Sequence, residues 1–188
     1  KIVCSTGVTA ESFGGMGFAP EKSLPAVVEL AKQFVELAEK YGVKLCYENC
    51  PMMGNIATSP DLWKDVFDAV DSEQLGLCYD PSHLVWQFID PYKNIYQFAD
   101  RIFHVHAKDF LYKPCTARNP GKGWFGTRGG AFLRGTVIGH GVVPVEACLR
   151  ILKNAGYDGT VAIEFEGMEP CEEAIALSRE NLAALMQL

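Results

Sequence analysis

Apolar positions along this chain follow two spacings in turn, one typical of helices and one typical of strands. Residues 26–38 place apolar side chains at helical intervals, and Gly42 stands where that helix should end. The short apolar run 43–48 follows, with the length of a buried strand. The same order recurs, with strands expected at 75–80, 101–107 and 160–166. Strand followed by helix, repeated roughly five times, predicts parallel βαβ units and an α/β fold.

Signals for helix starts support this order. A capping residue and a proline occur together in Ser23 with Pro25, Ser59 with Pro60, and Asp90 with Pro91. The capping oxygen accepts a hydrogen bond from a first-turn N–H group, and proline there removes an N–H that would have no partner. We therefore expect helices to begin at these places, and further helices at 144–155 and 170–185.

The predicted strands end in side chains that can bind a metal ion. These residues are Glu48, Asp80, His106 and Glu164. An open doubly wound sheet concentrates its site at one switch point, whereas a closed barrel collects side chains from many strand ends. The pattern therefore favours a TIM (β/α)8 barrel, in which such groups line the catalytic mouth.

The length of the chain predicts only part of such a barrel. A complete TIM barrel has eight strands and typically ~250 residues, whereas this chain has 188 residues and opens in the strand-like run Lys1-Ile2-Val3-Cys4. We expect residues 1–188 to form a single domain equivalent to roughly the last five βα units, with the first units preceding it in a longer protein. Period-two alternation predicts a deeper inward layer, made of Cys46, Cys78, His104 and Ala162.

Composition narrows the functional classes. The 17 basic and 23 acidic residues give a net charge of -6, which disfavours binding to the phosphate backbone of nucleic acids. The 7 cysteines show no C-x-x-C spacing, as is typical of reduced thiols in the cytoplasm. No stretch reaches the ~20 apolar residues of a membrane span. We expect a cytoplasmic protein with neither a nucleic-acid nor a membrane partner, and a homo-oligomer is compatible with this composition.

Several segments together resemble the sugar isomerase/epimerase group of xylose-isomerase-like TIM barrels, from about Val43 onward. The segments are Glu48-Asn49-Cys50-Pro51-Met52, Asp80-Pro81-Ser82-His83-Leu84, His104-Val105-His106-Ala107-Lys108-Asp109, Gly139-His140-Gly141, and Gly156-Tyr157-Asp158-Gly159 followed by Ile163-Glu164. The resemblance implies that one divalent ion is held by Glu48, Asp80, His106 and Glu164. It also implies that His83 contacts substrate oxygens.

The implied reaction is a proton transfer on a small sugar or polyol derivative. Moving a carbonyl group, or inverting the carbon beside it, requires removal of a weakly acidic C–H proton, and a metal ion stabilises the resulting enediolate. Oxygen and imidazole ligands suit Mg²⁺, Mn²⁺ or Co²⁺, and Zn²⁺ is also compatible. Glu48 and Glu164 are predicted to act as general base and general acid. The resemblance thus predicts a metal-dependent sugar isomerase or epimerase.

Four more residues are candidates for substrate contact. Trp86 can form a wall of the sugar site, and Lys108 and Asp109 can contact substrate or orient His106. Arg134 lies in the Gly-rich stretch 111–143, which is expected to be an irregular loop covering the substrate. Epimerases of the family can carry a substrate arginine six residues after the histidine ligand, where this chain has Tyr112.

Three alternatives remain open at the level of sequence. An inosose-type dehydratase begins with the same proton abstraction on the same fold. An endonuclease-IV-like metal nuclease requires an Asp-Arg-His run ahead of its Gly-His-Gly loop, and this chain has Leu133-Arg134-Gly135 there. A non-catalytic sugar-binding relative would be free to lose the four metal ligands, all of which are present.

Overall fold

A computed structural model describes residues 1–6, 20–52, 55–114, 118–127 and 130–186. Its main sheet has five strands in the order β1-β2-β3-β4-β8, and every neighbouring pair is parallel. The strands are β1 (Ile2–Cys4), β2 (Leu45–Glu48), β3 (Leu75–Tyr79), β4 (Ile102–Ala107) and β8 (Val161–Ile163). The helices are α2 (Pro20–Tyr41), α3 (Pro60–Val70), α4 (Pro81–Trp86), α5 (Lys93–Gln97), η1 (Ala99–Arg101), α6 (Val145–Asn154) and α7 (Cys171–Met186).

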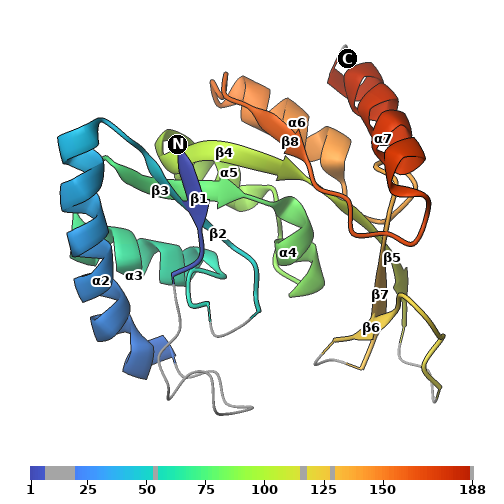
Figure 1. Ribbon diagram of the computed structural model, residues 1–188, viewed down its shortest axis with the longest axis horizontal. Helices are drawn as coiled ribbons and strands as arrows, with labels where there is room; N and C mark the ends of the chain where they lie inside the picture. Colours follow the sequence, from blue (N-terminus) through green and yellow to red (C-terminus); the bar gives the residue numbers. More distant parts are fainter. Residues whose placement is uncertain (7–19, 53–54, 115–117, 128–129, 187–188) are drawn as a thin grey trace.

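The sheet is curved, with helices α2 and α3 beside its first strands and α6 and α7 beside its last (Figure 1). All residues of β3 are buried, as expected for a strand covered on both faces. Helix α3 presents Trp63, Val66, Phe67 and Val70 to the core at helical spacing. The predicted α/β architecture of parallel βα units is therefore confirmed. Within the described residues, no helix is long and apolar enough to cross a membrane.

Two of the predicted helix starts are wrong. Helix α2 begins at Pro20, so Ser23 is a buried residue inside the helix and not its cap. Pro20 explains the extra turn, because proline is favoured at the first helical position. Helix α5 begins at Lys93, although Asp90 does accept a hydrogen bond of 2.7 Å from the N–H group of Tyr92.

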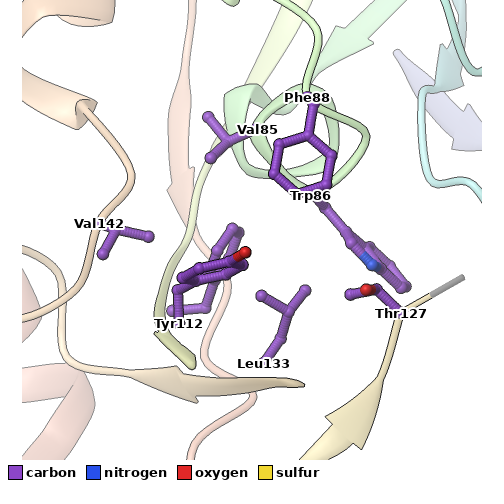
Figure 2. A pocket seen from close by; sticks show the side chains of 8 residues that line it. Val85, Trp86, Phe88, Tyr112, Thr127, Leu133 and Val142 are labelled. Atoms are coloured by element: carbon purple, nitrogen blue, oxygen red, sulfur yellow. The ribbon is translucent and has the colours of Figure 1, made fainter. Parts of the chain in front are cut away.

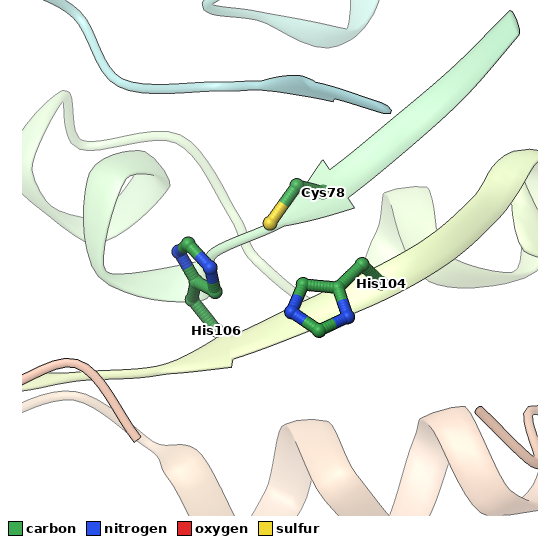
Figure 3. Close-up of side chains that lie close together, drawn as sticks. All are labelled: Cys78, His104 and His106. Atoms are coloured by element: carbon green, nitrogen blue, oxygen red, sulfur yellow. The ribbon is translucent and has the colours of Figure 1, made fainter. Parts of the chain in front are cut away.

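An irregularity between β3 and β4 decides which side chains face the site. Leu77 pairs with Ile102, but the next residue, Cys78, pairs with His104, so Phe103 is an extra residue in β4. Because side chains alternate along a strand, this one-residue shift places His104 and His106 on the face that Cys78 occupies (Figure 3).

Glycine makes this irregularity possible. A Cβ atom added to Gly76 would lie 2.3 Å from the backbone oxygen of Arg101 and 2.5 Å from the ring of Phe103. Any larger residue would therefore push Phe103 out of its place. The residues predicted from alternation to form a deeper layer share one face of the sheet, but the stagger of the strands places them at different levels. Cys78 and His104 are direct neighbours, whereas Ala162 pairs with His106 and Cys46 pairs with Gly76.

The stretch 111–143 is not the irregular loop expected from its sequence. In its described residues the chain forms a second, antiparallel sheet of β5 (Asp109–Lys113), β7 (Phe132–Thr136) and β6 (Phe125–Gly126). This small sheet extends away from the main sheet at the lower right of Figure 1. The hairpin satisfies backbone N–H and C=O groups that a loop would leave to solvent. The sequence did not reveal it because apolar residues do not alternate clearly in these strands.

Candidate active site

The polar residues at the strand ends meet at one edge of the main sheet. Glu48 ends β2, and Asp80 and Glu164 directly follow β3 and β8. Ligand atoms of Glu48, Asp80, His83 and Glu164 all lie within 4.8 Å of one another. The Nδ1 atom of His106 lies 3.2 Å from a carboxylate oxygen of Glu48 and 3.2 Å from one of Glu164. The structure thus brings three of the four predicted ligands, Glu48, Asp80 and Glu164, together with His83, and we call this group the acidic centre. The fourth predicted ligand, His106, contacts the two glutamates but does not belong to this convergent group.

The two carboxylate oxygens of Asp80 have different surroundings. Its Oδ1 atom accepts a hydrogen bond of 2.8 Å from the N–H group of Ser82 and thereby caps α4. Its Oδ2 atom is buried and has no hydrogen-bond partner, although charged groups lie near it. A buried carboxylate oxygen without a hydrogen bond is costly in a folded protein, unless a cation binds it. Asp80 therefore fits the role of a metal ligand.

Asn49 holds Asp80 in place, a role that the sequence reasoning missed. The Asn49 amide accepts a hydrogen bond of 2.8 Å from the N–H group of Asp80 and donates one of 2.9 Å to the Asp80 carbonyl oxygen. Asn49 is fully buried, so these bonds tie the ends of β2 and β3 together. The sequence signal for this role was the position of Asn49, a polar amide residue directly after the predicted ligand Glu48 at the end of an apolar run.

Lys108 inserts a positive charge among the acidic groups. Its ammonium group donates a hydrogen bond of 2.8 Å to Glu164 and lies 3.3 Å from Asp80 and 3.5 Å from Glu166. It also lies 3.1 Å from Nε2 of His83. Burial opposes the charged form, but Asp80 and Glu164 outweigh it and raise the pKa of Lys108 above its usual range. Lys108 therefore stays protonated at the centre of the site.

The other site residues also have strongly shifted pKa values. Hydrogen bonds with Cys78, Glu164 and Glu48 raise the pKa of His106 to about 12. Burial disfavours the charged ring of His83, but the carboxylates of Asp80 and Glu48 outweigh it and raise its pKa to about 9.

The pKa values of the two glutamates, Glu48 and Glu164, move the opposite way. Contact with His106 lowers the pKa of Glu164 to about 2, and contacts with His106 and His83 hold the pKa of Glu48 well below its usual range. Both glutamates are therefore ionised at neutral pH. Carboxylate oxygens and imidazole nitrogens in this arrangement suit a divalent ion such as Mg²⁺, Mn²⁺, Co²⁺ or Zn²⁺.

Asp109 has a structural role in place of the expected substrate contact. It is 1% exposed, and its Oδ2 accepts hydrogen bonds of 2.9 and 2.8 Å from the N–H groups of Gly139 and Gly141. Its Oδ1 accepts two more, from Phe110 and Val143. With four backbone donors bound, the carboxylate has no free oxygen to offer a substrate. The Gly-His-Gly segment therefore anchors Asp109.

Arg134 lies in a different environment from the acidic centre. It forms an ion pair with Glu169 at 3.8 Å, and its guanidinium lies over the ring of Trp124. Since Glu169 already neutralises this charge, Arg134 is a weaker candidate for an anionic substrate group than the sequence suggested.

Trp86 connects the acidic centre to an apolar cavity of about 190 Å³ (Figure 2). Its ring centroid lies 6.0 Å from that of His83 and 5.9 Å from that of Phe125. Tyr112, at the position of the family's substrate arginine, lines this cavity together with Phe88 and Leu133. Tyr112 thus offers an aromatic surface where those epimerases offer a charge.

Known proteins resemble this chain in sequence or in fold. The inosose dehydratase of Clostridium perfringens strain 13 is 28% identical over 156 residues, which are 82% of this chain and 51% of that protein. A D-tagatose 3-epimerase-like protein superposes with a TM-score of 0.70 at 24% identity, covering 98% of this chain and 61% of that one. The IOLI protein, solved with a zinc atom, gives 0.69 at 20% identity, covering 91% and 59%.

This chain spans about half the length of the curated relatives it matches. The sequence identity between this chain and these two solved structures is below 25%, so the similarity to them concerns the fold alone. The family profile described as xylose isomerase-like TIM barrel matches residues 4–188, which include every strand end discussed above. With parallel βα units, polar strand ends at one edge and this match over nearly its full length, the chain belongs to the xylose isomerase-like TIM barrel family.

Proposed function

We propose that this protein is a metal-dependent enzyme that removes a proton beside the carbonyl group of a sugar or polyol derivative. One observation carries the proposal: ligand atoms of Glu48, Asp80, His83 and Glu164 converge within 4.8 Å. The proposed ligands are the three carboxylates of this group, Glu48, Asp80 and Glu164, together with His106, whose Nδ1 atom lies 3.2 Å from Glu48 and 3.2 Å from Glu164. A divalent ion bound there would act as a Lewis acid on negative charge that develops on substrate oxygens.

The two glutamates are proposed to move the protons. Both are ionised, both contact Nδ1 of His106, and both keep part of their side chains exposed, 22% for Glu48 and 33% for Glu164. They come from opposite sides of the site, since β2 and β8 are separated by β3 and β4 in the sheet. One carboxylate can therefore take a proton from a bound substrate. The other can deliver a proton only after it has itself gained one, for example from water.

Dehydration of an inosose-type ketone is the first candidate for the complete reaction. A dehydratase must protonate a hydroxyl group as it leaves, and the charged groups of His83 and Lys108 stand beside Glu164 for this purpose. The similarity to inosose dehydratases supports the same choice. Epimerisation or isomerisation is the second candidate, and the paired glutamates favour it because the proton can be returned by a second carboxyl group once that group has been protonated.

Isotope exchange can test the proposed function. The protein at its natural length, supplied with Mn²⁺ or Co²⁺ in deuterated water, would be incubated with an inosose and with a panel of ketohexoses and ketopentoses. We expect deuterium at one carbon beside the carbonyl of the true substrate, detected by NMR. Loss of water from that substrate identifies a dehydratase, and a new stereoisomer identifies an epimerase. Absence of exchange in the whole panel, with metal shown to be bound, would contradict the proposal.

Metal binding should release protons. His106 is protonated well above neutral pH, because its pKa is raised to about 12. It can bind a metal through Nδ1 only after losing a proton, so the affinity for Mn²⁺ should rise up to about tenfold per pH unit and per proton released between about pH 6 and 8. Calorimetric titrations in phosphate and Tris buffers should give different apparent enthalpies.

The exposed residue His140 offers a matched control for that experiment. Its replacement by asparagine should leave the buffer dependence unchanged, since the His140 ring is exposed and, among the described residues, makes no ion pair with Glu48, Asp80 or Glu164. Identical enthalpies in the two buffers for the parent protein would show that binding displaces no proton.

A further inference from the structure

A second group of side chains of metal-binding types lies next to the acidic centre, and its residue His106 contacts Glu48 of that centre. Cys78 on β3 and His104 and His106 on β4 place one ligand atom each within 4.8 Å of the others. Their side chains point toward one another from neighbouring strands (Figure 3). The ring centroids of His104 and His106 are 5.3 Å apart, with the rings nearly perpendicular. The extra residue Phe103 in β4 is the reason that all three share a face.

The donor atoms of this group differ from those of the acidic centre. The group offers one sulfur and two imidazole nitrogens, a softer set than carboxylate oxygens and one that suits Zn²⁺ or Co²⁺. Nδ1 of His106 already faces Glu48 and Glu164, so Nε2 is the nitrogen left for Cys78 and His104. Cys78 is fully buried, whereas the two histidines are half-buried.

We propose that Cys78, His104 and His106 form a second metal site that takes Zn²⁺ or a similar soft divalent ion. Three protein ligands with one open position match the composition of many zinc sites. The site shares His106 with the proposed catalytic centre. Filling both sites through one imidazole would require the ring to lose both of its N–H protons. Occupation of the soft site therefore weakens metal binding at the acidic centre, and by linkage the reverse also holds.

Co²⁺ is a suitable probe because a cobalt–thiolate bond gives a charge-transfer band in the near ultraviolet. Added to the reduced protein at its natural length, Co²⁺ should produce this band and saturate it at one thiolate-bound ion per chain. Cys78→Ser should abolish the band. Cys148→Ser is the matched control, because Cys148 is also buried but lies on α6, outside the group. It should retain the full band.

Two further variants complete the test. Glu164→Gln should keep the band, because the soft site does not use a carboxylate, so failure of the proposed function would not remove it. His104→Asn should weaken Co²⁺ binding at least about tenfold. Loss of a residue that only hydrogen-bonds a metal ligand already costs about that much affinity, and loss of the ligand itself should cost more. If Cys78→Ser does not fold by circular dichroism, His104→Asn decides alone. No band in the parent protein, a band that persists without Cys78, or unchanged affinity in His104→Asn would each overturn the proposal.

Discussion

Glu164→Gln and Glu48→Gln should each lower turnover by about 10²–10⁴-fold while leaving the fold intact. Glutamine keeps the size of the side chain but cannot accept the substrate proton. Each glutamate also contacts Nδ1 of His106, so the amide should weaken metal binding as well. The measurement is therefore kcat at saturating Mn²⁺, on the substrate identified by isotope exchange, together with thermal melting of each variant.

Glu166→Gln is the control for this pair. Glu166 lies two residues beyond Glu164 on the same side of the chain, and its side chain is 53% exposed. It contacts Lys108 at 3.5 Å but neither histidine of the centre in the described structure. Its replacement should change kcat by less than about tenfold, a typical limit for losing one solvent-exposed ionic contact. If both Glu48→Gln and Glu164→Gln retain turnover within that same range, neither glutamate carries the chemistry.

Asp109→Asn should lower the free energy of unfolding by about 3–5 kcal/mol. The carboxylate accepts four backbone hydrogen bonds, from Phe110, Gly139, Gly141 and Val143. Asparagine offers only one acceptor oxygen, and its NH₂ group would face N–H donors that it cannot bond. Urea denaturation followed by circular dichroism, on the protein at its natural length, measures the change.

Asp65→Asn provides the comparison for that measurement. Asp65→Asn makes the same change from carboxylate to amide on the exposed face of α3. There the free energy of unfolding should change by no more than about 0.5 kcal/mol. An unfolding free energy of Asp109→Asn close to that of Asp65→Asn would show that water replaces the carboxylate at the four amides. Substrate affinity measured on folded Asp109→Asn would then decide whether the contact expected from sequence exists.

The sequence by itself determined the order of the main elements and the position of the acidic centre. Buried parallel strands must be continuous apolar runs, so β3 and its neighbours were visible without a structure. Parallel strands also end at the same edge of a sheet. Residues such as Glu48, Asp80 and Glu164 therefore had to lie near one another once the strands were assigned.

Contacts between distant segments were decided only by the tertiary structure. The position of Lys108 among three carboxylates depends on how β4 sits between β3 and β8, which spacing along one chain does not specify. Asp109 looked like a site residue because it follows the histidine motif. Its four partners became identifiable only when the segment 139–143 folded against it.

Alternation predicted that Cys78 and His104 share the inward face, but the register between β3 and β4 decided that they lie side by side. Alternation alone assigns a side chain to one of two faces, and a single extra residue reverses that assignment for the rest of the strand. Phe103 is that residue, and it fits because Gly76 on the neighbouring strand has no side chain. Local pattern thus determined which elements form, whereas packing between strands decided which side chains face one another.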